Sequence, residues 1–130
     1  MVERTNLKNK IKVALVSGAS KGVGFGIIEN LALSGFKVLA ISRNKKNLAA
    51  AQKTILKKHG IKIDIIVGDV SNLKLPKRIV DKCIKKWKRI DILVNNTGGP
   101  PPINISKAKF KDWDYAYKNN FMSVVSFIKN

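Results

Sequence analysis

The sequence predicts an α/β fold built on a doubly wound parallel sheet. Short runs rich in Val, Ile and Leu alternate with longer segments whose apolar residues recur every three to four positions. The short runs are almost continuously apolar, which is typical of strands that are buried on both faces. Strands that alternate with helices are joined by right-handed crossovers and therefore lie parallel in one sheet. We expect at least four such strands, with helices on both sides.

The individual elements follow in regular order along the chain. A strand over residues 11–16 leads into a helix over 23–34, which Gly35 can end, and Gly60 can end the next helix in the same way. The proline-rich stretch 95–102 must be a loop, because proline cannot continue a strand or a helix interior. The remaining predicted strands cover residues 37–41, 61–67 and 91–94, and the remaining helices cover 45–59, about 76–87, 110–119 and 121–128.

Size and composition indicate one folded domain. The chain has 130 residues, of which 45% are hydrophobic, which is enough for a real core. No window approaches the roughly 18 apolar residues of a membrane span, and residues 1–10 lack the apolar core of a signal peptide. Cys83 is the only cysteine and has no partner for an internal disulfide. A reducing, cytoplasmic setting is therefore the expectation, with no association with a membrane.

The formal net charge of +18 raises nucleic acid as a partner. Two observations argue against it. The basic residues are spread over all the helical segments, and most are Lys, whereas base recognition favours Arg. We interpret the charge as a general composition bias with solvated faces, and nucleic acid is disfavoured.

The most informative segment joins the first strand to the first helix. Residues 17–24 read Ser-Gly-Ala-Ser-Lys-Gly-Val-Gly, so three glycines stand at one strand-to-helix turn. Glycine lets the backbone approach a ligand closely, and a helix N-terminus offers unpaired N–H groups and a partial positive charge. This combination favours binding of the pyrophosphate of a dinucleotide.

The spacing of these glycines identifies a family. It differs from Gly-x-Gly-x-x-Gly, because Ile27 stands where the third glycine is expected. The pattern Ser17-Gly18-x-x-x-Gly22-x-Gly24 instead resembles the cofactor loop of the short-chain dehydrogenase/reductase family. Three further segments match that family in order: Gly68-Asp69-Val70, residues 95–98 (Asn-Asn-Thr-Gly) and residues 113–120. The resemblance covers essentially the whole chain and implies a Rossmann-type fold.

The resemblance also implies roles for particular residues. In this family the aspartate at the position of Asp69 contacts adenine, and the Asn-Asn-x-Gly segment lies near the adenosine and braces the sheet. The catalytic asparagine of the family falls on Asn120, with Asn119 as the neighbouring alternative. The predicted cofactor-binding residues are Ser17, Gly18, Ser20, Lys21, Gly22, Val23, Gly24, Ser42, Arg43, Asn44, Asp69, Val70, Asn95, Asn96, Thr97 and Gly98.

Charge predicts which nicotinamide cofactor is bound. NAD-binding folds place a carboxylate after the second strand to accept the ribose hydroxyls, but this chain has no Asp or Glu between Glu29 and Asp64. Arg43 follows the second strand instead, and Lys21 adds a cation in the glycine loop. An arginine fork pairs with a 2′-phosphate, which a carboxylate would repel. The sequence therefore predicts NADP(H) over NAD(H).

The implied reaction is hydride transfer between NADP(H) and a small-molecule carbonyl or alcohol substrate, with a 3-oxoacyl thioester as one candidate. The tyrosine and lysine of the family's Tyr-x-x-x-Lys pair are missing: Asn119 follows Tyr115 by four residues, and Phe121 follows Tyr117. We interpret both tyrosines as packing or surface residues. Residues 1–130 are then a single cofactor-binding domain that is truncated at its C-terminus and inactive alone, from a parent enzyme that is a homo-oligomer.

Two alternatives stay open on the sequence. The first is a non-catalytic module that binds a dinucleotide or a nucleic acid, which would show as duplex DNA binding with a steep salt dependence. The second is a methyltransferase, but this class would be expected to place an acidic residue after the second strand, where Ser42 and Arg43 stand. No metal site is expected, because the only histidine, His59, has no second ligand nearby in the sequence.

Overall fold

The computed structural model describes residues 11–99 and 101–130; residues 1–10 and Pro100, which belongs to the expected loop, lie outside the described part. Four parallel strands form one sheet in the order β3-β2-β1-β4. Leu15 in the central strand pairs with Leu39 on one side and with Leu93 on the other. The strands are β1 (Val13–Val16), β2 (Lys37–Ser42), β3 (Asp64–Val67) and β4 (Ile92–Val94), so the predicted fold class is confirmed.

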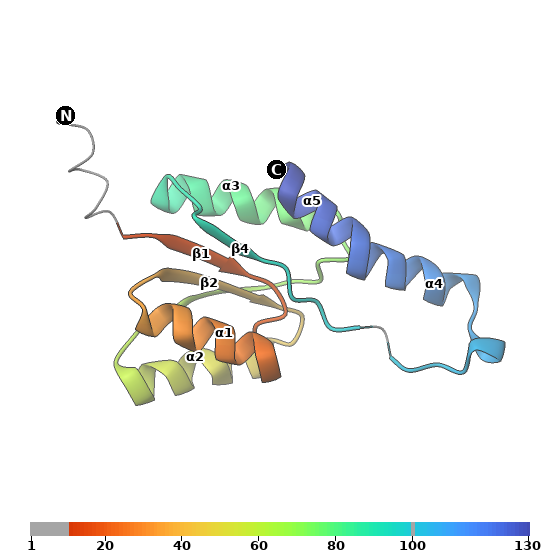
Figure 1. The fold of residues 1–130 in the computed structure, drawn as a ribbon, viewed down its shortest axis with the longest axis horizontal. Coiled ribbons are helices and arrows are strands. Elements are labelled where there is room, and N and C mark those ends of the chain that lie inside the picture. The colour runs from red at the N-terminus through yellow and green to blue at the C-terminus, as the bar shows by residue number, and fades with distance from the viewer. Residues whose placement is uncertain (1–10, 100) are drawn as a thin grey trace.

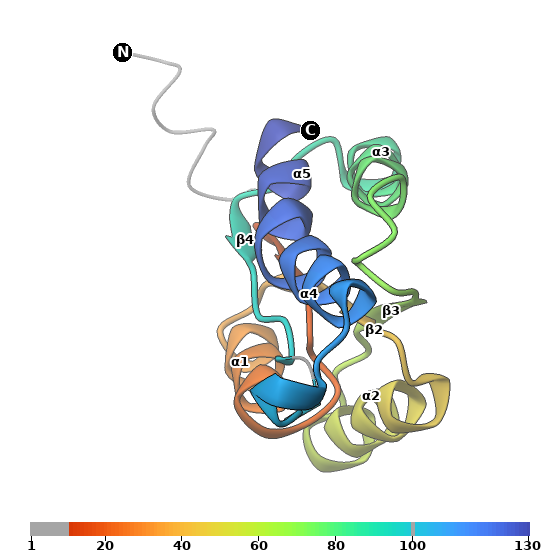
Figure 2. The same cartoon turned by 90° about the vertical axis from the view of Figure 1, so that its right-hand side faces the viewer.

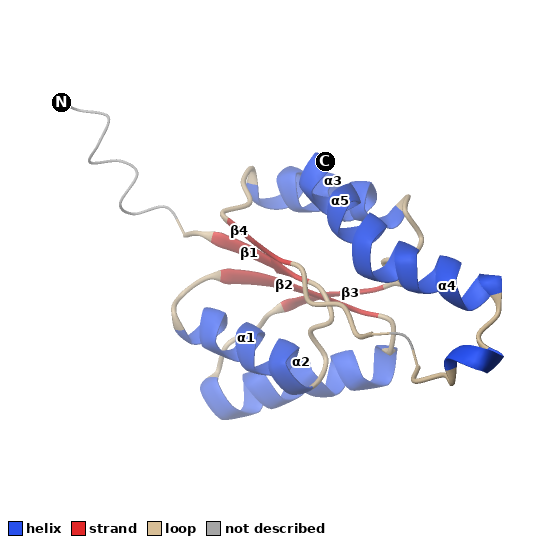
Figure 3. Ribbon diagram, turned by 45° about the vertical axis from the view of Figure 1, so that its right-hand side comes forward, coloured by secondary structure: helices blue, strands red, loops and turns tan. Residues whose placement is uncertain are grey.

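Helices cover both faces of the sheet (Figures 1 and 2). α1 (Gly22–Leu33) and α2 (Lys45–His59) lie on one face. α3 (Leu75–Trp87) and α5 (Ser123–Lys129) lie on the other face. Figure 3 shows the strands between these two helical layers, with α4 (Phe110–Tyr117) extending beyond the sheet. A short 3₁₀ turn, η1 (Ile105–Lys107), precedes α4.

The core is divided by the sheet into two layers, because successive strand residues point to opposite faces. Val16 packs with Ile28 in the layer beneath α1 and α2. Leu15 packs with Ile79 and Cys83 in the layer beneath α3 and α5. Cys83 is completely buried, and this burial raises the pKa of its thiol to about 11.

Local signals explain where the helices end. Asn44 caps α2, since its side chain accepts a hydrogen bond from the Asn47 N–H at 2.9 Å, and Gly60 ends α2 in the left-handed conformation with φ 69°. α3 ends at Trp87, and the following residue, Lys88, is its C-cap in the left-handed conformation with φ 63°. The sequence carries no glycine signal for this end.

The C-terminal helices are joined by a π-helical turn, η2 (Lys118–Met122), so that α4, η2 and α5 form one continuous rod. The sequence predicts two helices that are separated near residue 120, and the structure instead joins them there through this wider helical turn. The Ser123 hydroxyl donates to the Asn119 carbonyl at 2.5 Å inside the protein. A π turn adds a residue to the helical repeat and changes which side chains face the sheet.

Candidate functional site

The loops that follow all four strands open onto one cavity. It has a volume of about 400 Å³ and lies at the carboxyl ends of the strands, where the strand order reverses between β1 and β4. Open α/β sheets bind ligands at this topological switch point. The cavity is lined by Gly18, Ser20, Lys21, Val23, Gly24, Ile41, Ser42, Arg43, Asn44, Asn47, Gly68, Val70, Asn96, Thr97, Gly98 and Asn119.

The glycine loop is packed so tightly that side chains cannot replace two of its glycines. A Cβ on Gly18 would lie 1.6 Å from the Asn96 carbonyl oxygen, and one on Gly24 would lie 2.0 Å from the Gly18 carbonyl oxygen. Gly18 also has a left-handed backbone with φ 59°. The absence of side chains therefore lets the loop fold against the end of β4, beside the cavity.

Hydrogen bonds from the end of β4 hold this loop. The Ser17 hydroxyl accepts from the Asn96 N–H at 3.0 Å, and the Asn96 side-chain amide donates to the Gly18 carbonyl at 3.0 Å. The Ser17 N–H donates to the Val94 carbonyl at 3.0 Å. Ser17 is buried and does not line the cavity, so its contribution is to position the loop.

The first turn of α1 lies at the cavity with its backbone donors uncapped. Lys21 is the residue at the N-cap, and it makes no capping hydrogen bond with its side chain. The first turn holds no acidic residue, while Val23 and Gly24 line the cavity. Unpaired N–H groups and the positive end of the helix dipole suit an anionic group such as a diphosphate.

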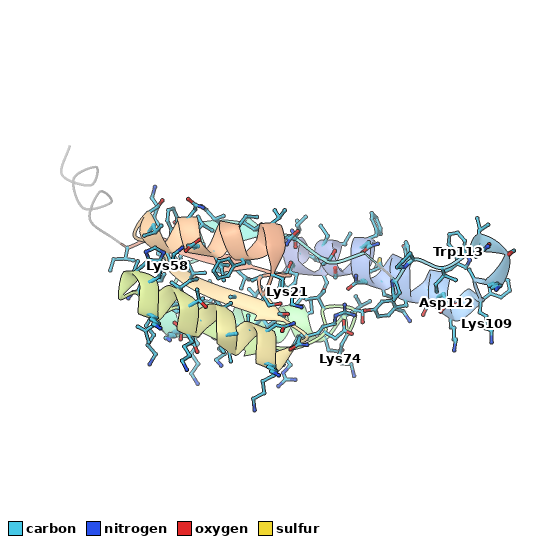
Figure 4. The ribbon with its side chains drawn as sticks, turned by 90° about the horizontal axis from the view of Figure 1, so that it is seen from below. Lys21, Lys58, Lys74, Lys109, Asp112 and Trp113 are labelled. Carbon is cyan, nitrogen blue, oxygen red and sulfur yellow. The ribbon has the colours of Figure 1, made fainter. Side chains whose placement is uncertain are left out.

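The charged side chains at the cavity are both cations. Lys21 lies where the glycine loop meets α1 (Figure 4), and Arg43 lies in the loop after β2. No Asp or Glu is among the described residues that line the cavity. The hydroxyls of Ser20 and Ser42 are 2.9 Å apart and connect the loops after β1 and β2. The residues present therefore fit a dinucleotide with additional negative charge.

Most of the predicted cofactor-binding residues line the cavity, and four do not: Ser17, Gly22, Asp69 and Asn95. The Asp69 carboxylate accepts from the Ser71 N–H at 2.9 Å, as in an Asx turn. The Asn95 side-chain oxygen is buried and has no hydrogen-bond partner among the described residues. The contact of Asp69 with adenine stays a prediction.

The two neighbouring asparagines occupy different environments. Asn119 is 3% exposed and lines the cavity, and its amide donates to the Gly98 carbonyl at 2.7 Å and to the Asn120 side-chain oxygen at 3.1 Å. Asn120 is exposed and does not line the cavity. Both residues belong to the π turn, whose geometry determines that Asn119 rather than Asn120 faces the cavity. The catalytic role assigned to Asn120 by the motif stays a prediction.

Four lining residues are absent from the predicted cofactor-binding set: Ile41, Asn47, Gly68 and Asn119, the last of which the sequence offered only as the alternative to Asn120. Three of them adjoin predicted site residues, so widening each motif by one position would have included them. Asn47 lies one helical turn beyond Ser42 to Asn44 and required knowledge of where α2 begins. A Cβ on Gly68 would lie 2.4 Å from a Leu75 methyl group, so a larger residue at this position would require the Leu75 side chain to move.

The described part of the chain holds neither a cluster of metal-ligating side chains nor a helix that could span a membrane. Residues 11–99 and 101–130 contain no group of three or more His, Cys, Asp or Glu side chains that could hold a metal ion. The same residues form no helix with the length and apolar character needed to cross a bilayer.

Comparison with known proteins agrees with this geometry. The sequence profile of the family described as short chain dehydrogenase matches residues 12–130. Tropinone reductase-like 3 of Erythroxylum coca is 39% identical over 90 residues, covering 69% of this chain and 34% of the relative. The 3-oxoacyl-(acyl-carrier-protein) reductase FabG of Thermotoga maritima is 34% identical over 113 residues, covering 87% and 46%. The chain belongs to the short-chain dehydrogenase/reductase family.

A solved structure extends the match to three dimensions. L-sorbose reductase from Gluconobacter frateurii, complexed with NADPH and L-sorbose, superposes with a TM-score of 0.83 at 26% identity, over 92% of this chain and 46% of that one. The fold is thus of the Rossmann type found in this family of oxidoreductases. The chain spans less than half the length of these relatives.

Proposed function

We propose that this chain supplies the NADP(H)-binding part of a short-chain oxidoreductase. The observation that carries the proposal is that loops from all four strands and the uncapped start of α1 meet at one cavity, whose charged lining residues are Lys21 and Arg43. The bound cofactor would supply the hydride exchanged with a carbonyl or alcohol carbon. The NADPH complex of L-sorbose reductase supports the choice of cofactor.

Each part of the cavity has a proposed task. The N–H groups at the start of α1 bind the pyrophosphate, and the tight packing at Gly18 and Gly24 lets the backbone come close to it. Arg43 and Lys21 bind the 2′-phosphate, because both are cations at the cavity and Arg43 follows β2, where NAD-binding folds carry a carboxylate. Val70 provides an apolar wall, and Asn96 and Ser17 keep the loop in place.

Catalysis requires groups that the sequence does not contain, since neither tyrosine is followed by lysine four residues later. We propose Asn120 as the catalytic asparagine on the motif and Asn119 as the asparagine that lines the cavity. We also propose a 3-oxoacyl thioester as one candidate substrate, on the name of the Thermotoga maritima relative. Cytoplasmic location and homo-oligomeric assembly of the whole protein belong to the same proposal. The 130-residue chain alone should show no NADPH-linked carbonyl reduction.

Cofactor titration tests the central claim. We expect the chain to bind NADPH more tightly than NADH by about 10- to 100-fold, the effect of one charge-assisted hydrogen bond. Arg43→Asp should reverse the preference, because the carboxylate repels the 2′-phosphate and accepts ribose hydroxyls. Isothermal titration calorimetry of both cofactors measures the ratio.

Arg78→Asp is the matched control, since Arg78 is exposed on α3 and carries the same change of charge. It should leave the ratio unaltered. Equal affinity of the unaltered chain for the two cofactors would contradict the proposal.

A further inference from the structure

Arg43 lines the cavity and contacts Tyr115, which lies outside it. Arg43 donates a hydrogen bond from Nη1 to the Tyr115 hydroxyl, although the two residues are 72 positions apart in the sequence. The guanidinium carbon also lies 6.0 Å from the centre of the Tyr115 ring. The contact therefore links the loop after β2 to α4.

Arg43 belongs to the wall between two hollows. On one side it lines the cavity at the strand ends, and on the other it lines a second hollow together with Tyr115, Asp112 and Pro101. The guanidinium is thus held at the rim of the first cavity by a residue that lies outside it. The sequence interpretation of Tyr115 as a packing or surface residue does not account for this hydrogen bond.

The hydrogen bond to Tyr115 leaves Arg43 able to bind an anion. A guanidinium has five N–H donors, so one hydrogen bond to Tyr115 leaves the others available. Because the tyrosine hydroxyl is neutral, Arg43 and Tyr115 together keep a net positive charge, whereas a carboxylate partner would bring the net charge of the pair to zero. Asp112 is the carboxylate at the second hollow, and it accepts a hydrogen bond from the Lys109 N–H at 2.9 Å. Within residues 11–99 and 101–130, Arg43 forms no ion pair.

We propose that Tyr115 is a positioning residue for recognition of the 2′-phosphate: its hydroxyl holds Arg43 at the cavity rim, with the remaining N–H groups directed to the phosphate. This inference rests on the proposed function, because it gives Arg43 a phosphate to bind. A preset arginine loses less conformational freedom when the phosphate arrives, so the ligand is bound more tightly.

The test compares two small probes that differ by the 2′-phosphate. Calorimetric titration of the full 130-residue chain uses adenosine 2′,5′-bisphosphate and adenosine 5′-monophosphate. Tyr115→Phe keeps the ring and removes the hydroxyl. We expect it to weaken binding of the bisphosphate by about three- to tenfold, a part of the factor for a direct charged hydrogen bond, and to leave the monophosphate unaffected.

Tyr117→Phe is the matched control. Tyr117 lies on the same helix, stacks on Phe121 with 5.4 Å between ring centres and does not line the cavity. It should change neither titration. A second comparison repeats Tyr115→Phe in an Arg43→Ala background, where no further loss of bisphosphate binding is expected, because Tyr115 acts through Arg43.

The outcomes separate the two proposals. If Arg43→Ala weakens bisphosphate binding but Tyr115→Phe does not, the role of Tyr115 is refuted and the phosphate site stands. If Arg43→Ala has no effect, or the unaltered chain does not bind the bisphosphate, the phosphate site fails and the inference fails with it. Tighter bisphosphate binding by Tyr115→Phe would show that Tyr115 competes with the phosphate. Equal weakening of both probes would show a structural role. Either result overturns the inference.

Discussion

Apolar side chains are buried in the region from β1 to β3, whereas many of those in the rod formed by α4, η2 and α5 are exposed. Ile28 in α1 is completely buried, as are Leu15 and Ile41 in the central strands. In the rod, Phe110 is 94% exposed and Ile128 is 70% exposed, and Trp113 lies toward the far end of α4 (Figure 4). Only one side of the rod reaches the core, through Asn119, Ser123 and Phe127.

This difference divides the candidate site into a firm side and a loosely supported side. Hydrogen bonds join the loop after β1 to the loop after β4 and to Ser42 at the end of β2, and the core beneath them is packed on both faces of the sheet. Asn119 lines the cavity and Tyr115 contacts Arg43, and both belong to the rod, where fewer buried apolar side chains oppose local opening. The side formed by the loops after β1 and β2 should therefore open less readily than the side formed by the rod.

The largest expected effect comes from the firm side. Gly18→Ala puts a methyl group 1.6 Å from the Asn96 carbonyl oxygen at a left-handed backbone position, so the loop must move. We expect a loss of about 5 kcal/mol or more in the free energy of unfolding, together with loss of cofactor binding. Urea unfolding and NADPH titration measure both effects.

Gly26→Ala provides the control for that substitution. A Cβ on Gly26, within α1, meets no atom within 4 Å, and alanine favours a helix over glycine by about 1 kcal/mol. It should be neutral or slightly stabilising. Similar losses for both glycines would mean that the tight packing of the loop is not what makes Gly18 necessary.

The same substitution, Ile→Ala, should have a different effect on the free energy of unfolding in each of the two regions. Ile28→Ala removes a fully buried side chain from the layer beneath α1 and should lower the free energy of unfolding by about 2–5 kcal/mol. Ile128→Ala, on the exposed side of the rod, should change it by about 0.5 kcal/mol at most. Denaturant unfolding gives both values, and comparable losses would mean that Ile128 is buried in solution.

The smallest expected effect on stability comes from Asp91, which lies just before β4 and bonds to the first residue of β1. Asp91 accepts hydrogen bonds from Arg89 Nε and from the Val13 N–H, each at 2.8 Å. Arg89, and after it the Val13 N–H, lower the pKa of Asp91 below its ordinary value of 3.8. The charged carboxylate therefore stabilises the folded state above pH 3.8, and this contribution is lost as the pH falls through the lowered pKa.

Asp91→Asn should accordingly be less stable than the unaltered chain at neutral pH, and the difference should shrink in acid. Thermal unfolding from pH 7 down to pH 2 measures it. Asp81→Asn is the control, because Asp81 forms an exposed ion pair with Lys77 within α3, and such pairs contribute little. A difference for Asp91→Asn that does not vary with pH would exclude the charge as its cause.

The firm region was also the more predictable from sequence. Continuous Val and Ile runs and the stops at Gly35 and Gly60 identify the elements, because these signals are local. Strand starts were less accurate: the strand predicted over 61–67 begins at Asp64, and the Ile63 carbonyl accepts instead from the Gln52 side chain at 2.8 Å. A side-chain contact of this kind leaves no periodic pattern.

The rod side of the site was not predictable in the same way. A repeat of 3.6 residues cannot reveal the π turn that brings Asn119 rather than Asn120 to the cavity. The contact between Arg43 and Tyr115 joins residues 72 positions apart in the sequence and depends on where α4 begins. Motif spacing therefore identifies the residues on the strand ends, whereas geometry decides which residues of a distant helix join them.

The strand order has a consequence for synthesis on the ribosome. β1 is made first yet lies inside the sheet, between β2 and β4. Its pairing with β2 needs only the next few dozen residues, but its other edge stays without a neighbour until Asp91 and β4 have been made, because Asp91 bonds to Val13 over a separation of 78 residues. The nascent chain therefore carries an open strand edge until β4 emerges, and closing that edge is the most non-local pairing step within the four-stranded sheet.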